Sequence, residues 1–248
     1  MVESRTSEAS SDCVQGRRKP LNADPLGGVG SNRLVAKFLV PACLVLVGFP
    51  ALYQLASRTA SAEAFFAGDR TYFATVIAAI LVLHWSSFTA AFFALSRVGI
   101  PPDHLGWPRW STLAWSCGLL VALGFALVLL REVVPYGGGD QPAIQLLPRT
   151  SGERALFVAS ALTAGICEEF VYRAFGIRLL ERAGIPTVAA ALLASAAWVM
   201  IHGQVGLVLF ATYLVIGAGF SALYLWRRSL IMPVVVHVLL DLAVILVP

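Results

Sequence analysis

Charged residues are scarce in this sequence. Asp, Glu, Lys and Arg make up only 13% of its 248 residues, about half of the roughly 25% found in average soluble domains. Hydrophobic residues make up 58%, and the mean hydropathy is +0.78. Such a chain has too little polar surface for an ordinary soluble domain. The composition therefore indicates an integral membrane protein that crosses the bilayer several times.

Two other kinds of pattern are missing. The four cysteines, at positions 13, 43, 117 and 167, show no CxxC or similar spacing, so neither a disulfide framework nor a cysteine-based metal site is expected. The basic residues behind the net charge of +4 are scattered over the tail and loops rather than gathered on one face. Such a distribution predicts no nucleic-acid partner.

The chain divides into a polar tail and one membrane domain. Residues 1–33 are rich in Ser, Gly and charged residues and have no apolar periodicity, so we predict a disordered tail there. Residues 34–248 are taken up by spans of about 20 residues each and form the predicted membrane-embedded domain. The motif Ala60-Ser61-Ala62 resembles a signal-peptide cleavage site. The apolar run before it is longer than a signal core and follows a long tail, so we expect an uncleaved first span.

Apolar runs separated by Pro, Gly and charged residues predict seven membrane-spanning helices. They are expected at about 35–56, 71–96, 111–134, 155–177, 186–203, 206–226 and 229–247. No internal repeat is evident. The predicted fold is therefore all-α, a polytopic transmembrane helix bundle of about seven spans.

Basic residues predict the orientation of this bundle. With the N-terminus inside, the cytoplasmic side carries twelve of them: Arg5, Arg17, Arg18, Lys19, Arg33, Lys37, Arg97, Arg109, Arg178, Arg182, Arg227 and Arg228. The opposite side carries five: Arg58, Arg70, Arg131, Arg149 and Arg154. The excess of positive charge favours a cytoplasmic N-terminus, and the plasma membrane is the expected location.

Three charged residues fall inside the predicted span at 155–177, namely Glu168, Glu169 and Arg173. A charge near the bilayer centre costs roughly 2.5–3.5 kcal/mol on insertion scales, and it usually faces the interior of a bundle at a functional site. Glu169 and Arg173 are i,i+4 neighbours that can pair, while Glu168 points about 100° away around the helix. An ion pair alone could serve helix packing. The second carboxylate leaves an excess negative charge and is a candidate general base.

The later spans add histidines and one more carboxylate. His202 ends the fifth predicted span, and Trp198 lies four residues before it on the same face. His237 and Asp241 form a second i,i+4 pair that projects from one face of the last helix. Asp241 could orient the imidazole, or both side chains could ligate a metal. We expect Glu168, His202 and His237 to share one water or ion in a polar cavity with apolar walls.

Together the three elements resemble the signature of the CPBP family of intramembrane proteases, also called the Abi or type II CAAX prenyl endopeptidase family. That signature has Glu-Glu-x-x-x-Arg, then an aromatic residue four before a His, then His-x-x-x-Asp/Asn, each on its own helix. Here it reads Glu168-Glu169-Phe-Val-Tyr-Arg173, Trp198-Val-Met-Ile-His202 and His237-Val-Leu-Leu-Asp241, within about residues 150–248. Trp198 stands where the family commonly has Phe, and Asp241 stands where its prenyl-protein proteases have Asn.

The resemblance implies an endopeptidase that acts in the membrane on a membrane-associated or lipidated protein, through a Glu/His-activated water. The implied catalytic set is Glu168 as general base, His202 as its assistant, His237 with Asp241 at the oxyanion, and Glu169 with Arg173 holding the geometry and charge. No cofactor is favoured, because the HExxH spacing of soluble zinc proteases is absent. A divalent metal such as zinc is the alternative, with Glu168, His202, His237 and Asp241 as its ligands.

Other nucleophiles compete with the glutamate mechanism. Ser221, followed by His237 on the next helix, faintly resembles the Ser/His dyad of rhomboid proteases, but serine is common in membrane helices for packing. Cys167 lies in an apolar neighbourhood, where a thiol is expected to be inert. His84 and His104 have no companion motif, and we predict structural or loop roles for them.

Other classes of function compete with proteolysis. Carboxylates and histidines inside a bundle also build ion-coupled transporters, and some members of the resembled family are known chiefly as immunity or scaffold factors. Transporters often show paired repeats with broken helices. In this sequence the polar residues are confined to the C-terminal half, with no matching first half, so proteolysis is favoured over transport.

Overall fold

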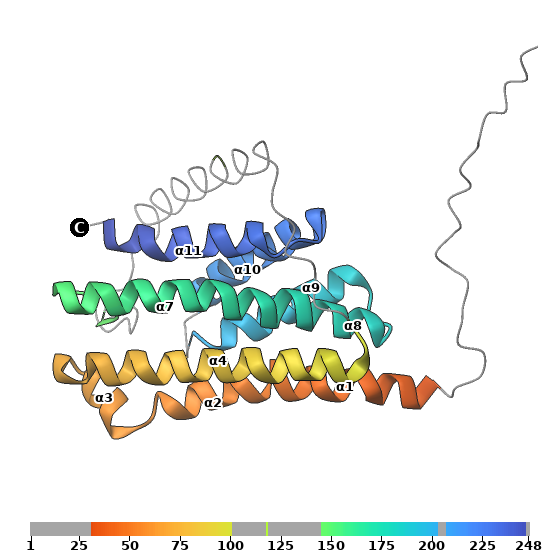
Figure 1. Ribbon diagram of the computed structural model, residues 1–248, viewed down its shortest axis with the longest axis horizontal. Coiled ribbons are helices and arrows are strands. Elements are labelled where there is room, and N and C mark those ends of the chain that lie inside the picture. Colours follow the sequence, from red (N-terminus) through yellow and green to blue (C-terminus); the bar gives the residue numbers. More distant parts are fainter. Residues whose placement is uncertain (1–30, 101–117, 119–144, 203–206, 247–248) are drawn as a thin grey trace, which may run out of the picture. The chain divides into compact units, whose positions relative to one another are not determined.

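Helices make up all the regular secondary structure in the part of the chain that the structure, a computed structural model, describes: residues 31–100, 118, 145–202 and 207–246. The elements in chain order are α1 (Ser31–Leu46), α2 (Gly48–Ala56), α3 (Ala60–Phe66), η1 (Arg70–Tyr72), α4 (Phe73–Val98), α7 (Ser151–Glu169), η2 (Phe170–Ile177), α8 (Arg178–Arg182), α9 (Thr187–Met200), α10 (Leu207–Arg227) and α11 (Ile231–Leu246) (Figure 1). No strand occurs among these residues, and the prediction of an all-α membrane bundle is confirmed.

Four helical segments are long and apolar enough to cross a membrane: Ala36–Ala56, Arg70–Val98, Ser151–Arg182 and Leu209–Arg227. Each lies at one of the predicted spans. Two shorter apolar helices, Thr187–Met200 and Ile231–Ala243, lie at the predicted spans 186–203 and 229–247. The 14 residues of α9 rise about 21 Å, which is less than the roughly 30 Å of a bilayer core.

Some predictions fall on parts of the chain that lie outside the described residues. These are the span at 111–134, apart from position 118, and the disordered tail up to residue 30. Helix α1 begins at Ser31, three residues before the predicted boundary of the membrane domain at 34.

The first span consists of two helices because of a proline. Pro50 lies in the first turn of α2 and has no N–H with which to bond the carbonyl of Leu46, four residues earlier. The N–H of Val47 still bonds the carbonyl of Cys43 at 2.9 Å, and that of Ala51 bonds Val47 at 3.1 Å. Helices α1 and α2 therefore follow each other directly and form one apolar segment that is interrupted only at Val47.

The span that carries the two glutamates begins at a fixed point. Thr150 caps α7 through a capping box, in which its hydroxyl accepts from the N–H of Glu153 and the Glu153 carboxylate reaches back. The same carboxylate pairs with Arg70 at 2.6 Å. This ion pair ties the start of α7 to the start of α4, since Arg70 lies in η1 directly before α4.

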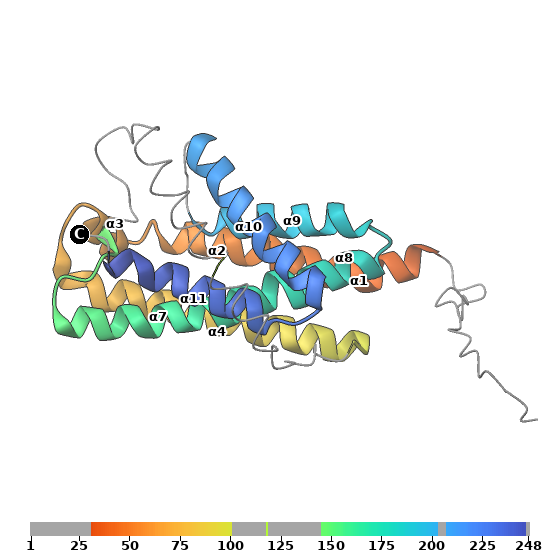
Figure 2. The ribbon, with the colours of Figure 1, turned by 90° about the horizontal axis from the view of Figure 1, so that it is seen from above.

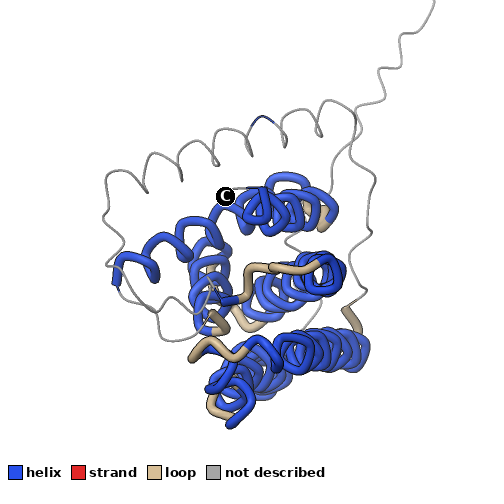
Figure 3. Tube along the Cα trace, turned by 90° about the vertical axis from the view of Figure 1, so that its left-hand side faces the viewer, coloured by secondary structure: helices blue, strands red, loops and turns tan. Residues whose placement is uncertain are grey.

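The glutamate-bearing helix lies between helices that are distant in sequence. In Figure 1, α7 runs between α4 and α11, and it packs against both. The view along the bundle shows the same layers (Figure 3). Helix α9 packs against η2 and α10, and α10 crosses α11 at a steep angle (Figure 2). Residues at the end of α7 therefore face side chains from α4, α9 and α11.

A glycine permits the close approach of α7 and α11. A Cβ atom placed on Gly165 would overlap the side chain of Val238 and lie 3.3 Å from the carbonyl oxygen of Val234. A larger residue would fit there only if the Val238 side chain or α11 itself moved. Because Gly165 lies one turn before Glu168 and Glu169, this contact brings α11 within reach of both carboxylates.

Candidate active site

Glu168 lies at the end of α7 and accepts hydrogen bonds from two other helices. Nε2 of His84, in α4, lies 2.6 Å from Glu168 Oε1. The indole N–H of Trp198, in α9, donates to Oε2 of the same carboxylate. Only 6% of the Glu168 surface is exposed. Its two oxygens are thus held by two ring systems that can donate N–H, and no arginine or lysine pairs with it among the described residues.

Glu169 has very different surroundings, although it is the next residue. Its Oε1 lies 3.2 Å from Arg173 NH1 and 2.7 Å from Nδ1 of His237. Glu169 and Arg173 are both completely buried. This carboxylate compensates a buried cation, and removing one member of such a pair would leave an uncompensated charge in a dry environment.

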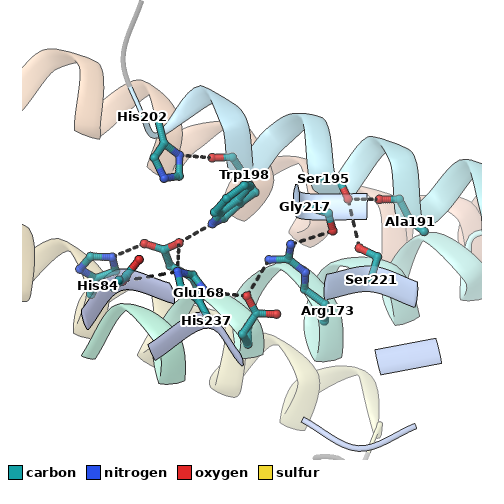
Figure 4. A network of polar contacts seen from close by, with 12 residues as sticks. His84, Glu168, Arg173, Ala191, Ser195, Trp198, His202, Gly217, Ser221 and His237 are labelled. Atoms are coloured by element: carbon teal, nitrogen blue, oxygen red, sulfur yellow. Dashed lines mark hydrogen bonds and ion pairs between the residues drawn. The ribbon is translucent and has the colours of Figure 1, made fainter. Parts of the chain in front are cut away.

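Arg173 is enclosed on several sides. Its NH2 group donates to the backbone carbonyl of Gly217, in α10, at 3.0 Å. The guanidinium carbon lies 5.4 Å from the Trp198 ring centre and 5.3 Å from that of Phe220, so both rings face the cation. Arg173 therefore connects α10 and α9 to the glutamate-bearing helix (Figure 4).

The segment after Glu169 winds as a π-helix. It covers Phe170–Ile177, and all of its residues are buried. Helical stretches of this type are rare and occur frequently at functional sites. Apolar periodicity does not distinguish π from α winding, so the sequence predicted only a helix here. The i,i+4 pairing of Glu169 with Arg173 nevertheless forms as expected from the sequence.

His237 lies among three carboxylates. Its Nδ1 atom bonds Glu169, while its Nε2 atom lies 3.8 Å from Glu168 Oε2 and 3.7 Å from Asp241 Oδ2. The latter two distances are ion-pair separations and exceed hydrogen-bond length. The ring of Phe220 stacks on the imidazole with centres 4.9 Å apart. His237 is therefore fixed in its plane, with Nε2 directed between Glu168 and Asp241.

His202 lies beside this group without a direct bond to it. Helix α9 ends at Met200, and the N–H of His202 bonds the carbonyl of Val199 in a tighter turn. Its Nδ1 atom lies 3.1 Å from the carbonyl oxygen of Trp198, and its ring stacks on Tyr213 at 4.6 Å. Figure 4 shows the ring pointing toward the part of the site where Glu168 and His84 meet.

Two site residues were not identified from the sequence. His84, predicted to be structural or a loop residue, is buried within α4 and contacts Glu168 directly. Trp198 was interpreted only as a bulkier substitute for Phe, yet its N–H reaches Glu168. The signal that could have revealed His84 is its position, since an ionisable residue in the middle of an apolar span is a candidate for a functional site.

The alternative nucleophiles make no hydrogen bond with a histidine in the described structure. The Ser195 hydroxyl donates to the carbonyl of Ala191, so the proton shared between Ser195 and Ser221, 3.0 Å apart, comes from Ser221. No bond between Ser221 and His237 occurs in the described structure. Cys167 is fully buried. His104 lies outside the described residues.

The proposed metal ligands do not form a common coordination shell. Within the described ranges, no group of three or more His, Cys, Asp and Glu side chains is arranged to hold one metal ion. His202 directs Nδ1 to the Trp198 carbonyl, and His237 directs Nδ1 to Glu169. The side chains as they stand fit a hydrogen-bonded network better than a zinc site.

Part of the chain matches the model of a known protein family. Residues 150–243 match the family model described as type II CAAX prenyl endopeptidase Rce1-like. The matched region runs from the cap of α7 into α11 and contains all six predicted catalytic residues, while α1 to α4 lie outside it. No curated protein and no solved structure matches the chain.

Proposed function

We propose that this integral membrane protein hydrolyses a peptide bond of a membrane-associated or lipidated protein, with Glu168 activating the attacking water. The match of residues 150–243 to the Rce1-like type II CAAX prenyl endopeptidase family supports this proposal. The observation that carries this proposal is the division of labour between adjacent carboxylates. Glu169 is committed to Arg173, which is always charged, whereas the groups around Glu168 are ring N–H donors of His84, Trp198 and His237. A general base needs a carboxylate that can accept a proton without leaving a buried guanidinium unpaired.

The reaction begins when water gives a proton to Glu168 while its oxygen forms a bond to the carbonyl carbon of the substrate. The carbonyl π electrons move onto the oxygen and create an oxyanion. When this tetrahedral intermediate collapses, the carbon–nitrogen bond breaks, and the protonated Glu168 returns its proton to the leaving amine nitrogen. The products are a carboxylic acid and an amine, and Glu168 is restored; the acid then gives its proton to the amine, which leaves a carboxylate and an ammonium group.

His237 is the proposed oxyanion donor. The bond from its Nδ1 to Glu169 fixes the ring. The Nε2 atom has ion-pair neighbours at 3.7 and 3.8 Å but no hydrogen-bond partner among the described residues. Since Nδ1–H is given to Glu169, the protonated imidazole carries a second N–H at Nε2 that can donate to a developing negative charge, and Asp241 balances the charge of the ring.

His202 is the proposed second holder of the water. With Nδ1–H donated to the carbonyl of Trp198, its Nε2 atom carries a lone pair. A water between this lone pair and Glu168 would be oriented by donating one hydrogen bond to the His202 Nε2 atom and the other to the Glu168 carboxylate. This arrangement needs no direct contact between His202 and Glu168.

The proposed setting is the plasma membrane, with the N-terminus in the cytoplasm, as the excess of basic residues on that side favours. The buried position of Glu168 between α4, α9 and α11 suits a substrate that enters from within the bilayer. Membrane lipid surrounds the bundle, and a membrane protein or a lipidated peptide is the proposed substrate.

The experiment that tests this function compares the ends of membrane proteins. A strain that lacks this protein is complemented with either the wild type or Glu168→Gln, and the termini of its membrane proteins are mapped by mass spectrometry. We expect new termini that appear with the wild type and are absent with Glu168→Gln. The same set of protein termini in both complemented strains would contradict proteolysis and favour a non-catalytic membrane factor or a transporter.

A metal-independent reaction is part of the proposal and has its own test. Metal ligands must be deprotonated, so a zinc site loses metal to chelators and at low pH. We expect the detergent-solubilised protein to keep most of its activity after prolonged treatment with a membrane-permeant chelator, and elemental analysis to find well under one metal per chain. Stoichiometric zinc that is lost and restored together with activity would reassign His237 and Asp241 as ligands.

A further inference from the structure

His84 lies in α4, outside the region that matches the peptidase family, yet it contacts Glu168 directly. Nε2 of His84 and Oε1 of Glu168 are 2.6 Å apart, although the two residues are 84 positions apart in sequence. The His84 side chain is only 4% exposed. A contact this short between buried groups is typical of a charge-assisted hydrogen bond.

The bond to Glu168 is the only hydrogen bond that the His84 ring makes in the described structure. Its Nδ1 atom is buried without a partner. The nearby hydroxyl of Ser87 donates to the backbone carbonyl of His84 and not to its ring. Tyr53 contacts the ring edge-on, with centres 5.5 Å apart, which fixes the plane of the imidazole. A histidine retained for packing alone would not need to direct Nε2 at a carboxylate.

Two N–H donors from different helices restrain the Glu168 carboxylate. His84 holds Oε1 from α4, and Trp198 holds Oε2 from α9 (Figure 4). Since both oxygens are held, the carboxylate plane cannot rotate about its last torsion without breaking a bond. The remaining lone pairs are then directed toward the side of the site that His202 and His237 line.

We propose that His84 is a positioning residue for the reaction, and that α4 completes a catalytic site whose other members come from the family-matched region. This inference rests on the proposed function. In the proposed role, His84 donates Nε2–H to the Glu168 carboxylate, while its buried Nδ1 atom makes no hydrogen bond in the described structure. His84 touches neither the water nor the substrate, and it acts through the orientation of Glu168.

Three variants of the full-length protein in liposomes test the role of the donor. His84→Phe keeps the ring against Tyr53 but removes the N–H, and His84→Gln supplies an N–H at a similar reach. Ile77→Ala is the control, because Ile77 is a buried α4 residue in a separate apolar cluster and its loss destabilises the protein without touching Glu168. Cleavage is followed with a quenched fluorescent peptide that ends in a prenylated CAAX sequence.

We expect kcat to fall roughly 10- to 100-fold in His84→Phe, as for loss of a hydrogen bond to a charged group. KM should change little, and His84→Gln should recover most of kcat. Ile77→Ala should keep kcat near that of the wild type at temperatures where it remains folded. Wild-type kcat in His84→Phe, or a loss in His84→Gln as large as in His84→Phe, would overturn the positioning role.

Infrared spectroscopy detects the contact between His84 and Glu168 even if the peptide is not a substrate. The difference between wild-type and Glu168→Gln spectra identifies the carboxylate stretch of Glu168. We expect this band to shift in His84→Phe and to return toward its original position in His84→Gln. An unshifted band in His84→Phe would reject the contact itself. Absence of cleavage by the wild type together with the expected band shift would count against the proposed protease function alone.

Discussion

Glu168 and Glu169 are neighbours in the chain, yet the two sides of the helix end on which they lie are built differently. The Glu169 side is a closed ion-pair network with Arg173, His237 and the Gly217 carbonyl, and it has no exposed surface at Glu169 or Arg173. The Glu168 side is made of ring N–H donors and an adjacent histidine, His202.

The difference gives two identical side chains different chemical properties. A buried carboxylate paired with arginine cannot take up a proton without leaving the arginine unpaired in a dry environment. A carboxylate that accepts from imidazole and indole N–H groups leaves no guanidinium unpaired when it takes up a proton. The Glu169 side is therefore expected to hold the structure, and the Glu168 side is expected to do the chemistry.

The largest effect should come from breaking the Glu169 side. Arg173→Met leaves Glu169 without its guanidinium and should lower the free energy of unfolding by about 3–5 kcal/mol. Thermal unfolding of the detergent-solubilised protein measures this change. Arg97→Met, at the exposed end of α4, is the matched control and should unfold like the wild type. Equal midpoints for the two variants would remove the structural role of the Glu169 side.

Breaking the Glu168 side should affect the rate instead. Glu168→Gln keeps the size of the side chain but removes the base, so single-turnover cleavage by purified protein should fall at least roughly 100-fold. Its thermal midpoint should fall far less than that of Arg173→Met. Glu63→Gln, on the exposed surface of α3, is the control for loss of one carboxylate. Unfolding of Glu168→Gln as severe as that of Arg173→Met would erase the distinction between the two sides.

A smaller change removes one of the two hydrogen bonds on the Glu168 side. Trp198→Phe keeps an aromatic ring near Arg173 and His202 but removes the N–H that Glu168 accepts. We expect kcat to fall about tenfold, the effect of roughly 1.4 kcal/mol. Trp85→Phe, at an exposed position of α4, is the control. Full activity in Trp198→Phe would mean that His84 alone orients the carboxylate.

The smallest effects are expected where the structure shows packing rather than chemistry. Ser221→Ala removes the hydroxyl that bonds Ser195 and should cost about 0.5–1.5 kcal/mol of stability, with the cleavage rate essentially unchanged. Cys167→Ala should likewise leave the rate unaltered. Rate assays and thermal unfolding of both variants measure these outcomes. Loss of cleavage in either one, with Glu168→Gln still active, would transfer the mechanism to a hydroxyl or thiol nucleophile.

Local periodicity was sufficient for part of this architecture. The apolar runs predicted the positions of α1 with α2, α4, α7, α9, α10 and α11, because a span needs about 20 apolar residues regardless of its neighbours. Helix α3 lies in no predicted span. The pairing of Glu169 with Arg173, and the approach of His237 and Asp241 to 3.7 Å, follow from i,i+4 spacing on one helix. The break at Pro50 is likewise a local consequence of a missing N–H, although it was not predicted.

The partners of Glu168 and the link between Glu169 and His237 depended on tertiary structure. Those contacts join residues 30, 68 and 84 positions apart, and no spacing rule relates side chains on different helices. His84 carries no motif because its role arises only when α4 packs beside α7. The sequence by itself determined that charges lie inside the membrane and that two of them pair. Helix packing alone decided which neighbours each carboxylate meets, because the environment of a buried charge is set by the surfaces that exclude water from it.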